Sequence, residues 1–148
     1  MDESMRRKIL ELLDGHRIMT VATLRPDGWP QATTVGYVSE GLTLYFLCSP
    51  ASQKARNLAR DDRVSVTIDH DTPDPMAITG LSLAARARPV ADYAEVARIL
   101  GMLPGKFPEY KGIELPRPDQ VRVFRLTPEV ISVLDYRQGF GHTDLVTP

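Results

Sequence analysis

The segment Ser49–Leu58 reads Ser-Pro-Ala-Ser-Gln-Lys-Ala-Arg-Asn-Leu and combines residue types that bind phosphate groups. Its alanine and leucine residues repeat at helical spacing and Ser52 is a preferred N-terminal cap, so a helix over residues 52–60 is predicted. Lys54 then lies in the first turn, where a cation opposes the helix dipole and costs about 0.3–1 kcal/mol without an anion. Free N–H groups, the hydroxyls of Ser49 and Ser52 and the lysine would together hold a phosphate. A solvated lysine on a short surface helix explains the same segment equally well.

The segments on either side of this helix read as the strands that must position it. Leu42–Leu47, just before it, is rich in β-branched, aromatic and aliphatic residues, and Arg63–Asp69, just after it, alternates. Ile18–Leu24 and Gln31–Val38 are also β-rich, and Arg25–Gly28 between them supplies the proline and glycine of a hairpin turn. Such short connections predict mostly antiparallel pairing.

The rest of the chain is interpreted from the same kinds of signal. The predicted elements are a helix over residues 4–14 that Gly15 ends, a strand over Met76–Val90, a helix capped by Asp92 that Pro104-Gly105 ends, and two strands over Gln120–Leu126 and Val130–Asp135. Within the long strand, Gly80 marks a bulge or a close backbone approach. Residues 104–119 hold four prolines and two glycines, and so long a loop is usually functional or mobile.

Composition limits the classes of function. Hydrophobic residues make up 43% of the 148 residues and charged residues 25%, as in ordinary globular proteins. A net charge of −1 argues against nucleic acid as a partner. Cys48 is the only cysteine, which favours a reducing compartment. Without an apolar leader or a membrane-length run, we expect a soluble cytoplasmic protein and no membrane partner.

The elements combine into one predicted domain over residues 1–148, with an N-terminal helix in residues 1–15 and a polar, glycine-rich tail over residues 136–148. Six or seven strands, about three helices and short turns predict a mainly β fold, an antiparallel barrel with peripheral helices, because closure removes exposed edges. No βαβ alternation is present, which argues against a dinucleotide-binding parallel sheet. The acidic loop at residues 69–75 lacks the glycine and distal glutamate of a calcium loop, so no metal site is predicted.

The order of several short motifs resembles the flavin-binding split β-barrels related to pyridoxamine 5′-phosphate oxidase. The motifs that carry the resemblance lie between residues 18 and 69 and are Met19–Leu24, Asp27–Pro30, Thr33–Val35, Leu44–Phe46, Ser52–Leu58 and Asp62–Val66. The resemblance implies a homodimer that holds FMN between its subunits.

Residue by residue, the resemblance implies a cofactor site on two strands and one helix. Thr33, Thr34 and Val35 would line the flavin and its ribityl chain. Leu47, Cys48 and Ser49 would contact the cofactor near the ribityl chain and phosphate, and Ser52, Gln53 and Lys54 would hold the phosphate.

The chain departs from the oxidase at two of these positions. The oxidase has arginines where Thr33 and Gln53 stand, and charge-assisted hydrogen bonds are roughly twice as strong as neutral ones. Lys54, backbone N–H groups and Arg56 must therefore compensate. The oxidase's C-terminal Arg-x-His segment is also absent, which argues against pyridoxamine phosphate as the substrate.

The implied function is an FMN-dependent oxidoreductase with a small-molecule substrate, in which the flavin performs hydride or electron transfer. No residue is assigned a catalytic role, and the substrate, electron donor and acceptor stay open. Tyr136, Phe140 and His142 of the tail are candidates for covering the flavin, and an ordinary disordered tail is the alternative. Two other functions stay open: a flavin- or haem-binding carrier, sensor or stress protein without turnover, and a deazaflavin-dependent reductase. Haem would have His16, His70 and His142 as its available imidazole ligands.

Overall fold

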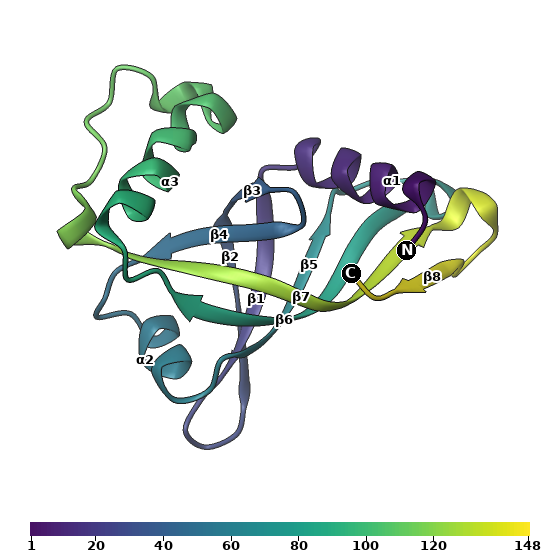
Figure 1. Ribbon diagram of the computed structural model, residues 1–148. Helices are drawn as coiled ribbons and strands as arrows, with labels where there is room; N and C mark the ends of the chain where they lie inside the picture. The colour runs from purple at the N-terminus through teal and green to yellow at the C-terminus, as the bar shows by residue number, and fades with distance from the viewer.

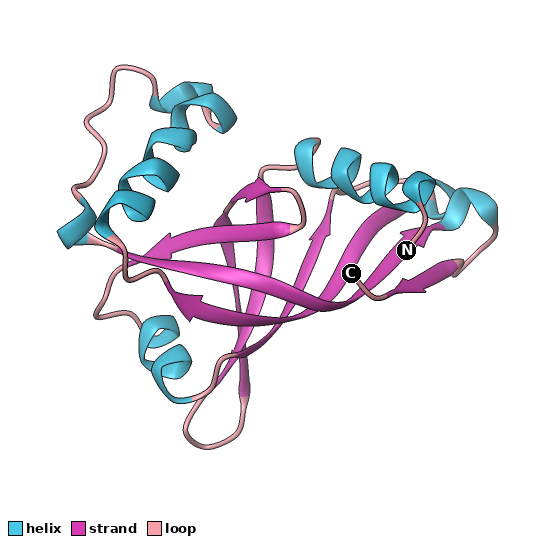
Figure 2. Ribbon diagram, viewed as in Figure 1, coloured by secondary structure: helices cyan, strands magenta, loops and turns pink.

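The computed structural model describes all residues from Met1 to Pro148. Three α-helices lie outside a curled sheet (Figures 1 and 2). The elements are α1 (Glu3–Asp14), β1 (Ile18–Leu24), β2 (Pro30–Gly36), β3 (Val38–Glu40), β4 (Thr43–Cys48), α2 (Gln53–Arg60), β5 (Arg63–Asp69), β6 (Thr79–Pro89), α3 (Tyr93–Lys106), β7 (Arg122–Asp135) and β8 (Thr143–Val146), with short 3-10 turns η1 (Pro75–Ala77), η2 (Pro108–Tyr110), η3 (Pro118–Gln120) and η4 (Tyr136–Gln138).

All strands belong to one antiparallel sheet in the order β2-β1-β5-β6-β7-β4-β3, and β8 pairs with β7. β2 and β3 are the two edges of this path, yet they are separated in the chain only by Tyr37. The sheet therefore curls until its edges meet at this corner, which leaves a half-barrel with α1 along one end and α2 and α3 near the other (Figure 1). The predicted mainly β split barrel with three helices is confirmed.

Tyr37 fixes this corner to two helices. Its ring is 1% exposed, and its hydroxyl donates to the Leu13 carbonyl at 2.6 Å, in the last turn of α1. The ammonium group of Lys106, in the last turn of α3, lies 4.2 Å from the centre of the Tyr37 ring and donates to the same carbonyl at 2.8 Å. Burial raises the pKa of the Tyr37 hydroxyl, so this group stays protonated and donates its hydrogen bond at neutral pH.

The apolar side chains form two cores on opposite faces of the sheet. The larger cluster holds 20 buried residues and lies between the concave face and the helices α1 and α2, and the smaller holds nine and lies between β4, β7 and α3. Strand β4 separates them, because Leu44 and Phe46 pack into the first cluster while Tyr45 packs into the second. Burial on both faces explains why this strand reads as a continuous apolar run.

The prediction of two strands over Gln120–Leu126 and Val130–Asp135 is wrong, because a single strand, β7, covers both. It runs unbroken from Arg122 to Asp135, and Glu129 is an extra residue, because Ala84 and Ala85 of β6 pair with Val130 and Pro128. β4 pairs with β7 only up to Leu126 and β8 pairs with it only from Ile131, so Pro128 lies where one edge has no neighbour. Proline is tolerated at an edge and at a bulge, and the strand therefore continues.

Two other boundaries differ from the prediction. Helix α3 passes through Pro104 and ends at Lys106, because a proline in the last turn removes only one helical hydrogen bond, and the Phe107 N–H still reaches the Leu103 carbonyl at 2.7 Å. The predicted tail contains β8, since Gly139 and Gly141 adopt positive φ angles and turn the chain back onto β7.

The strand predicted over Met76–Val90 is shorter, because η1 precedes it and it begins at Thr79. Gly80 marks a close backbone approach: a Cβ there would lie 2.7 Å from the Ile68 carbonyl oxygen. The bulge falls instead opposite Ala84 and Ala85. No helix combines the length and the apolar character needed to cross a membrane.

Candidate functional site

The first turn of α2 presents backbone donors to solvent. Ser52 is the N-cap, as predicted, and its hydroxyl oxygen accepts from the Ala55 N–H at 3.2 Å. The Ser49 hydroxyl oxygen accepts from the Ala51 N–H at 3.2 Å. The N–H groups of Gln53 and Lys54 have no acceptor within the chain. Two donors at the positive end of the helix are therefore free for an anion.

Two cations stand beside these donors without a carboxylate partner. Lys54 is half-buried, its ammonium group forms no ion pair or hydrogen bond, and the first turn contains no acidic residue. Arg56 folds back over the start of the helix, where its guanidinium donates to the Ala51 carbonyl and, at 2.8 Å, to the Gln53 side-chain oxygen. Both positive charges therefore add to the positive potential at the start of the helix and favour a bound anion.

Asn57 fixes α2 against the sheet, a role that the sequence analysis missed. Its side chain is 0% exposed and donates to the Thr23 hydroxyl at 2.9 Å and the Gln31 side chain at 3.3 Å. It also accepts from the Gln53 amide at 2.8 Å. The Gln53 side chain is therefore occupied by Asn57 and Arg56, and this residue offers an anion its backbone N–H.

Strand β2 leads from α2 along the concave face. Thr33 and Val35 lie opposite Val21 and Met19 of β1, two core residues, whereas Thr34 is exposed on the other face. The Thr33 hydroxyl oxygen is the only buried side-chain polar atom in the structure without a hydrogen-bond partner. Since buried polar groups are normally paired, this hydroxyl is a candidate for contact with a bound molecule.

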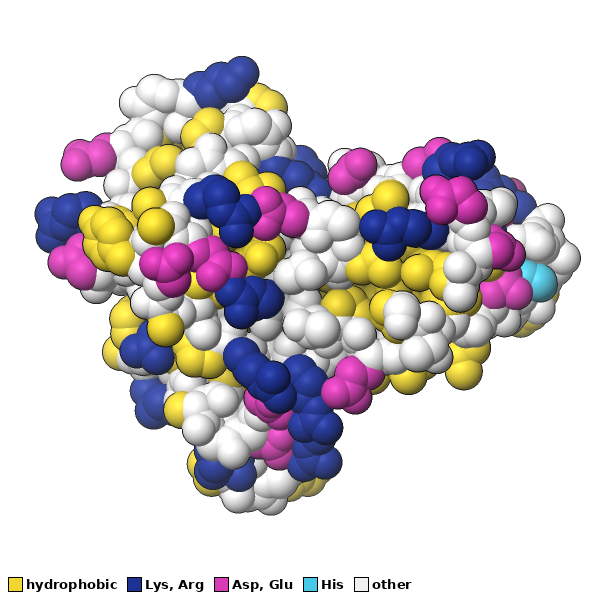
Figure 3. Space-filling view, in the orientation of Figure 1, with side chains coloured by type: hydrophobic (Ala, Val, Ile, Leu, Met, Phe, Trp, Pro, Cys, Tyr) yellow, Lys and Arg dark blue, Asp and Glu magenta, His cyan; other side chains and the backbone are white.

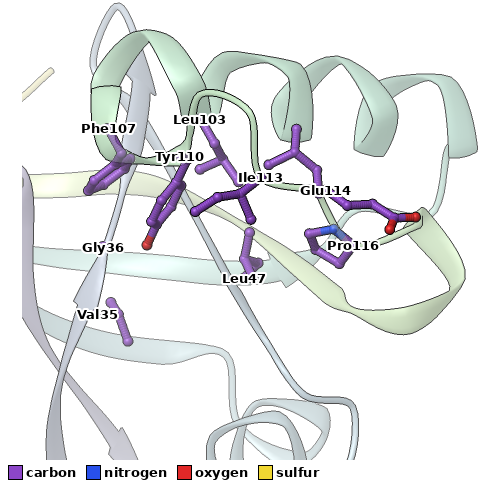
Figure 4. Close-up of a pocket in the computed structure, with 10 residues that line it drawn as sticks. Val35, Gly36, Leu47, Leu103, Phe107, Tyr110, Ile113, Glu114 and Pro116 are labelled. Carbon is purple, nitrogen blue, oxygen red and sulfur yellow. The ribbon is translucent and has the colours of Figure 1, made fainter.

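An apolar cavity of about 430 Å³ opens at the Val35 end of β2. We call it the β2–α3 cavity, and Figure 4 shows its lining: Val35, Gly36, Leu47, Leu103, Phe107, Tyr110, Ile113, Glu114, Leu115 and Pro116. The end of α3 and the segment after it provide most of these residues, so the long loop predicted to be functional or mobile forms one wall. Gly36 lets this wall come close, because a Cβ there would lie 3.0 Å from the Phe107 ring.

The predicted residues of β4 divide between the two sides of the strand. Leu47 lines the cavity, whereas Cys48 packs against the larger core and Ser49 is exposed at the start of the loop before α2. Arg122 of β7 lies directly across from Cys48. No local sequence pattern singles out this arginine, because only the strand pairing brings it to the end of β4.

The three tail residues lie away from α2 and the cavity within one chain. Tyr136 donates its N–H to the Ile78 carbonyl at 2.9 Å and its ring contacts Phe140 edge to face. His142 contacts Asp144 at 3.1 Å. This end of the molecule is the one covered by α1, opposite to α2 (Figure 1).

Charged side chains gather close to α2 on one face of the molecule. Lys and Arg side chains, with Asp and Glu among them, gather at the lower part of the molecule where α2 and the β1–β2 hairpin lie (Figure 3). Several of these arginines are paired: Arg86 and Arg88 both donate to Asp62, at 2.9 and 3.1 Å, and Arg86 lowers the pKa of Asp62 most. This network is internal to the sheet, which leaves Lys54 and Arg56 as the cations available at the helix start.

The curled antiparallel sheet, which is open beside the apolar cavity, is a split β-barrel. The cationic start of α2 lies at the other end of the edge strand β2. The family model of pyridoxamine 5′-phosphate oxidase matches residues 5–135. The chain belongs to this family, as its motifs predicted.

Individual relatives are more distant. General stress protein 26 from Bacillus subtilis is 26% identical over 69 residues, which are 47% of this chain and about half (49%) of that protein's length. A haem-binding protein from Mycobacterium smegmatis superposes with a TM-score of 0.80 at 23% identity, over 99% of this chain and 59% of that one. The haem storage protein HutZ from Vibrio cholerae gives a TM-score of 0.68 at 23% identity, over 83% and 89%. These two structures share the fold.

Proposed function

We propose that this chain binds FMN and acts as a flavin-dependent oxidoreductase on an apolar small molecule. One observation carries the proposal: β2 connects a cationic, acid-free helix start to an apolar cavity, with an unpaired buried hydroxyl between them. Gln31 at the α2 end and Val35 at the cavity end are four residues apart, which is roughly 13 Å along a strand. That spacing suits an elongated ligand with a charged end and an apolar end.

The residues present fit FMN at both ends. The N–H groups of Gln53 and Lys54 and the cations of Lys54 and Arg56 would hold the phosphate, and the hydroxyl protons of Ser49 and Ser52 are available to it. Arg56 supports this assignment, because its guanidinium lies beside Gln53, the position at which the oxidase has its own arginine.

The other end of the ligand would meet β2 and β4. The Thr33 hydroxyl would gain a partner, while Val35 and Leu47 would pack on the apolar part and exclude water. Bound FMN would supply hydride or electron transfer, and the protein would orient it and admit a substrate through the β2–α3 cavity. Glu114 is the only charged residue of that cavity, so a neutral substrate fits it better than a phosphorylated one.

A homodimer is part of the proposal. The outer face of the β1–β5–β6 sheet presents small uncharged residues, among them Ser65, Thr67, Ser82 and Ala84, which are exposed. Exposed apolar side chains accompany them: Trp29 is 70% exposed and Leu145 is 72% exposed. An uncharged strip along the middle of this face, with Arg63 and Asp69 at the two ends of β5, suits packing against a second copy, which would supply further walls to the cofactor site.

Haem is the second candidate, because two proteins that share the fold are a haem-binding protein and a haem storage protein. No histidine lines the β2–α3 cavity, and His16 and His70 contact each other instead. An absorbance spectrum of the purified protein distinguishes the candidates. We expect the two absorbance bands of oxidised FMN. A Soret band would identify the cofactor as haem, and a single deazaflavin band would identify it as a deazaflavin.

The decisive experiment is a titration of apoprotein with FMN, followed by flavin fluorescence and thermal unfolding. FMN at a hundred times its dissociation constant should stabilise the fold by about 2.7 kcal/mol. Lys54→Glu should raise the dissociation constant about 10- to 100-fold, because a charged hydrogen bond is worth about 1.5–3 kcal/mol. Lys111→Glu, at an exposed lysine of the cavity loop, is the matched control and should bind as the native chain does. Equal affinity in both variants would overturn the phosphate assignment.

A further inference from the structure

Two histidines that lie 54 residues apart in the sequence meet outside the proposed flavin site. His16 follows α1 and His70 follows β5, and the ring nitrogens His16 Nε2 and His70 Nδ1 are 3.0 Å apart. The pairing of β1 with β5, in which Thr20 lies opposite Thr67, brings the start of β1 beside the end of β5. The meeting of the two rings is therefore fixed by the register of the sheet.

The other nitrogen of His16 is already used. His16 Nδ1 lies 2.7 Å from the Leu12 carbonyl oxygen of α1, an acceptor, so Nδ1 carries the proton. In the neutral ring, Nε2 therefore accepts from the Nδ1–H of His70, and a bound metal ion would replace this bridging proton, with the neutral His70 ring carrying its proton on Nε2 instead. A histidine whose second nitrogen donates to a backbone carbonyl is the arrangement usual for a metal ligand, because the hydrogen bond fixes the ring and its tautomer.

The two rings face each other nitrogen to nitrogen, with their centroids 5.2 Å apart, and a small rotation of the exposed His70 ring would turn both nitrogens toward one shared metal ion. An ion bound about 2.0–2.1 Å from both would make an N–metal–N angle of roughly 90–100°. That angle is closer to the angle between neighbouring ligands of a tetragonal site than to the tetrahedral angle. Tetragonal nitrogen and oxygen sites are typical of Cu²⁺ and Ni²⁺. No third His, Cys, Asp or Glu completes a cluster, so water would occupy the remaining positions.

We propose that His16 and His70 form a two-histidine site for a tetragonal divalent metal, Ni²⁺ or Cu²⁺. The site joins the end of α1 to the end of β5, and it is independent of the proposed flavin site. Because only the folded chain brings the two rings together, the metal should stabilise the fold. Affinity should follow Cu²⁺ over Ni²⁺.

The test is a calorimetric titration of the native chain with NiCl₂, together with thermal unfolding at the same metal concentrations. His70→Gln should weaken binding about tenfold or more, and so should His16→Gln. His142→Gln is the matched control, since the third histidine of the chain contacts Asp144 and should not contribute. Cys48→Ser tests whether the thiol takes part and should also leave binding unchanged.

His70→Gln keeps the result interpretable if His16→Gln perturbs the end of α1, because His70 is exposed and makes no other hydrogen bond. The electron paramagnetic resonance spectrum of the Cu²⁺ complex should show coupling to two imidazole nitrogens, reduced to one in His70→Gln. Binding that survives His70→Gln, or a native chain that does not bind Ni²⁺ or Cu²⁺, would overturn the site.

Discussion

The two ends of the half-barrel use positive charge in opposite ways. At the α1 end, Lys8 and Arg137 both donate to the carboxylate of Asp135, at 2.6 and 2.8 Å, and Asp135 is 4% exposed. At the α2 end, Lys54 and Arg56 have no carboxylate partner. The first arrangement satisfies its charges within the chain, whereas the second leaves them for a ligand.

The difference separates stability from binding. Arg137, and then Lys8, hold the pKa of Asp135 well below its usual range, which means that the ionised carboxylate stabilises the folded state. Lys54 and Arg56 oppose the α2 dipole and contribute nothing comparable to folding. Substitutions at the α1 end should therefore change the stability of the fold, and substitutions at the α2 end should change ligand binding.

The largest expected effect is at Asp135. Asp135→Asn removes the charge that holds two cations and should lower the free energy of unfolding by about 1–3 kcal/mol, because both cations still reach water. Asp27→Asn removes an exposed partner of Arg25 and should cost less than about 1 kcal/mol. Urea unfolding at pH 7 measures both. An Asp135→Asn variant as stable as Asp27→Asn would break the comparison.

The same carboxylate predicts the direction of the acid response. Its folded pKa lies below the unfolded value near 4, so its contribution is fully present above that value and is lost as the pH falls below it. Urea midpoints of the native chain and Asp135→Asn should therefore differ by a constant amount from pH 7 to about pH 5 and begin to approach each other as the pH falls toward 3. A difference that stays constant down to pH 3 would show that the lost stability is not electrostatic.

Arg56→Gln tests the other end. The variant keeps a polar side chain and loses the charge, so the FMN dissociation constant should rise about tenfold, or about 1.4 kcal/mol. The free energy of unfolding without FMN should change by less than about 0.5 kcal/mol, because the guanidinium has no acidic partner. Fluorescence titration and urea unfolding on one preparation give both numbers. A loss of stability equal to the loss of affinity would make Arg56 a structural residue.

The smallest effect should have opposite signs with and without ligand. Thr33→Val replaces an unpaired buried hydroxyl by a methyl group, and should stabilise the ligand-free chain by about 1 kcal/mol. The same change should weaken FMN binding, since the partner of the flavin is removed. Thr34→Val, on the exposed face of the same strand, should alter neither quantity. Thermal unfolding with and without FMN measures the pair.

Local signals predicted much of the fold and the core of the candidate site. The cap at Ser52, the position of Lys54 and the alternation of β5 are encoded within a few residues, and all three were predicted correctly. The role of Asn57 was not, because its partners Thr23 and Gln31 lie 34 and 26 residues away.

The errors in the strands have the same origin. Pro128 interrupts the sequence pattern of β7, and only the positions of β4 and β8 show that the missing N–H does no harm. The cavity likewise depends on Gly36 and Phe107 meeting from segments 71 residues apart, as counted from their numbers. Contacts between residues so far apart in the chain leave no periodic pattern in the sequence that would reveal them.

Tyr37, the single residue between the edge strands β2 and β3, couples the split of the half-barrel to helix α1. The wall of the cavity at Gly36 and the hydroxyl of Tyr37 are adjacent in the chain, and Tyr37 holds the last turn of α1. A molecule that widened the split would displace Tyr37, weaken its hydrogen bond to the Leu13 carbonyl and loosen the last turn of α1. Hydrogen exchange in the last turn of α1 would then report on what enters the cavity.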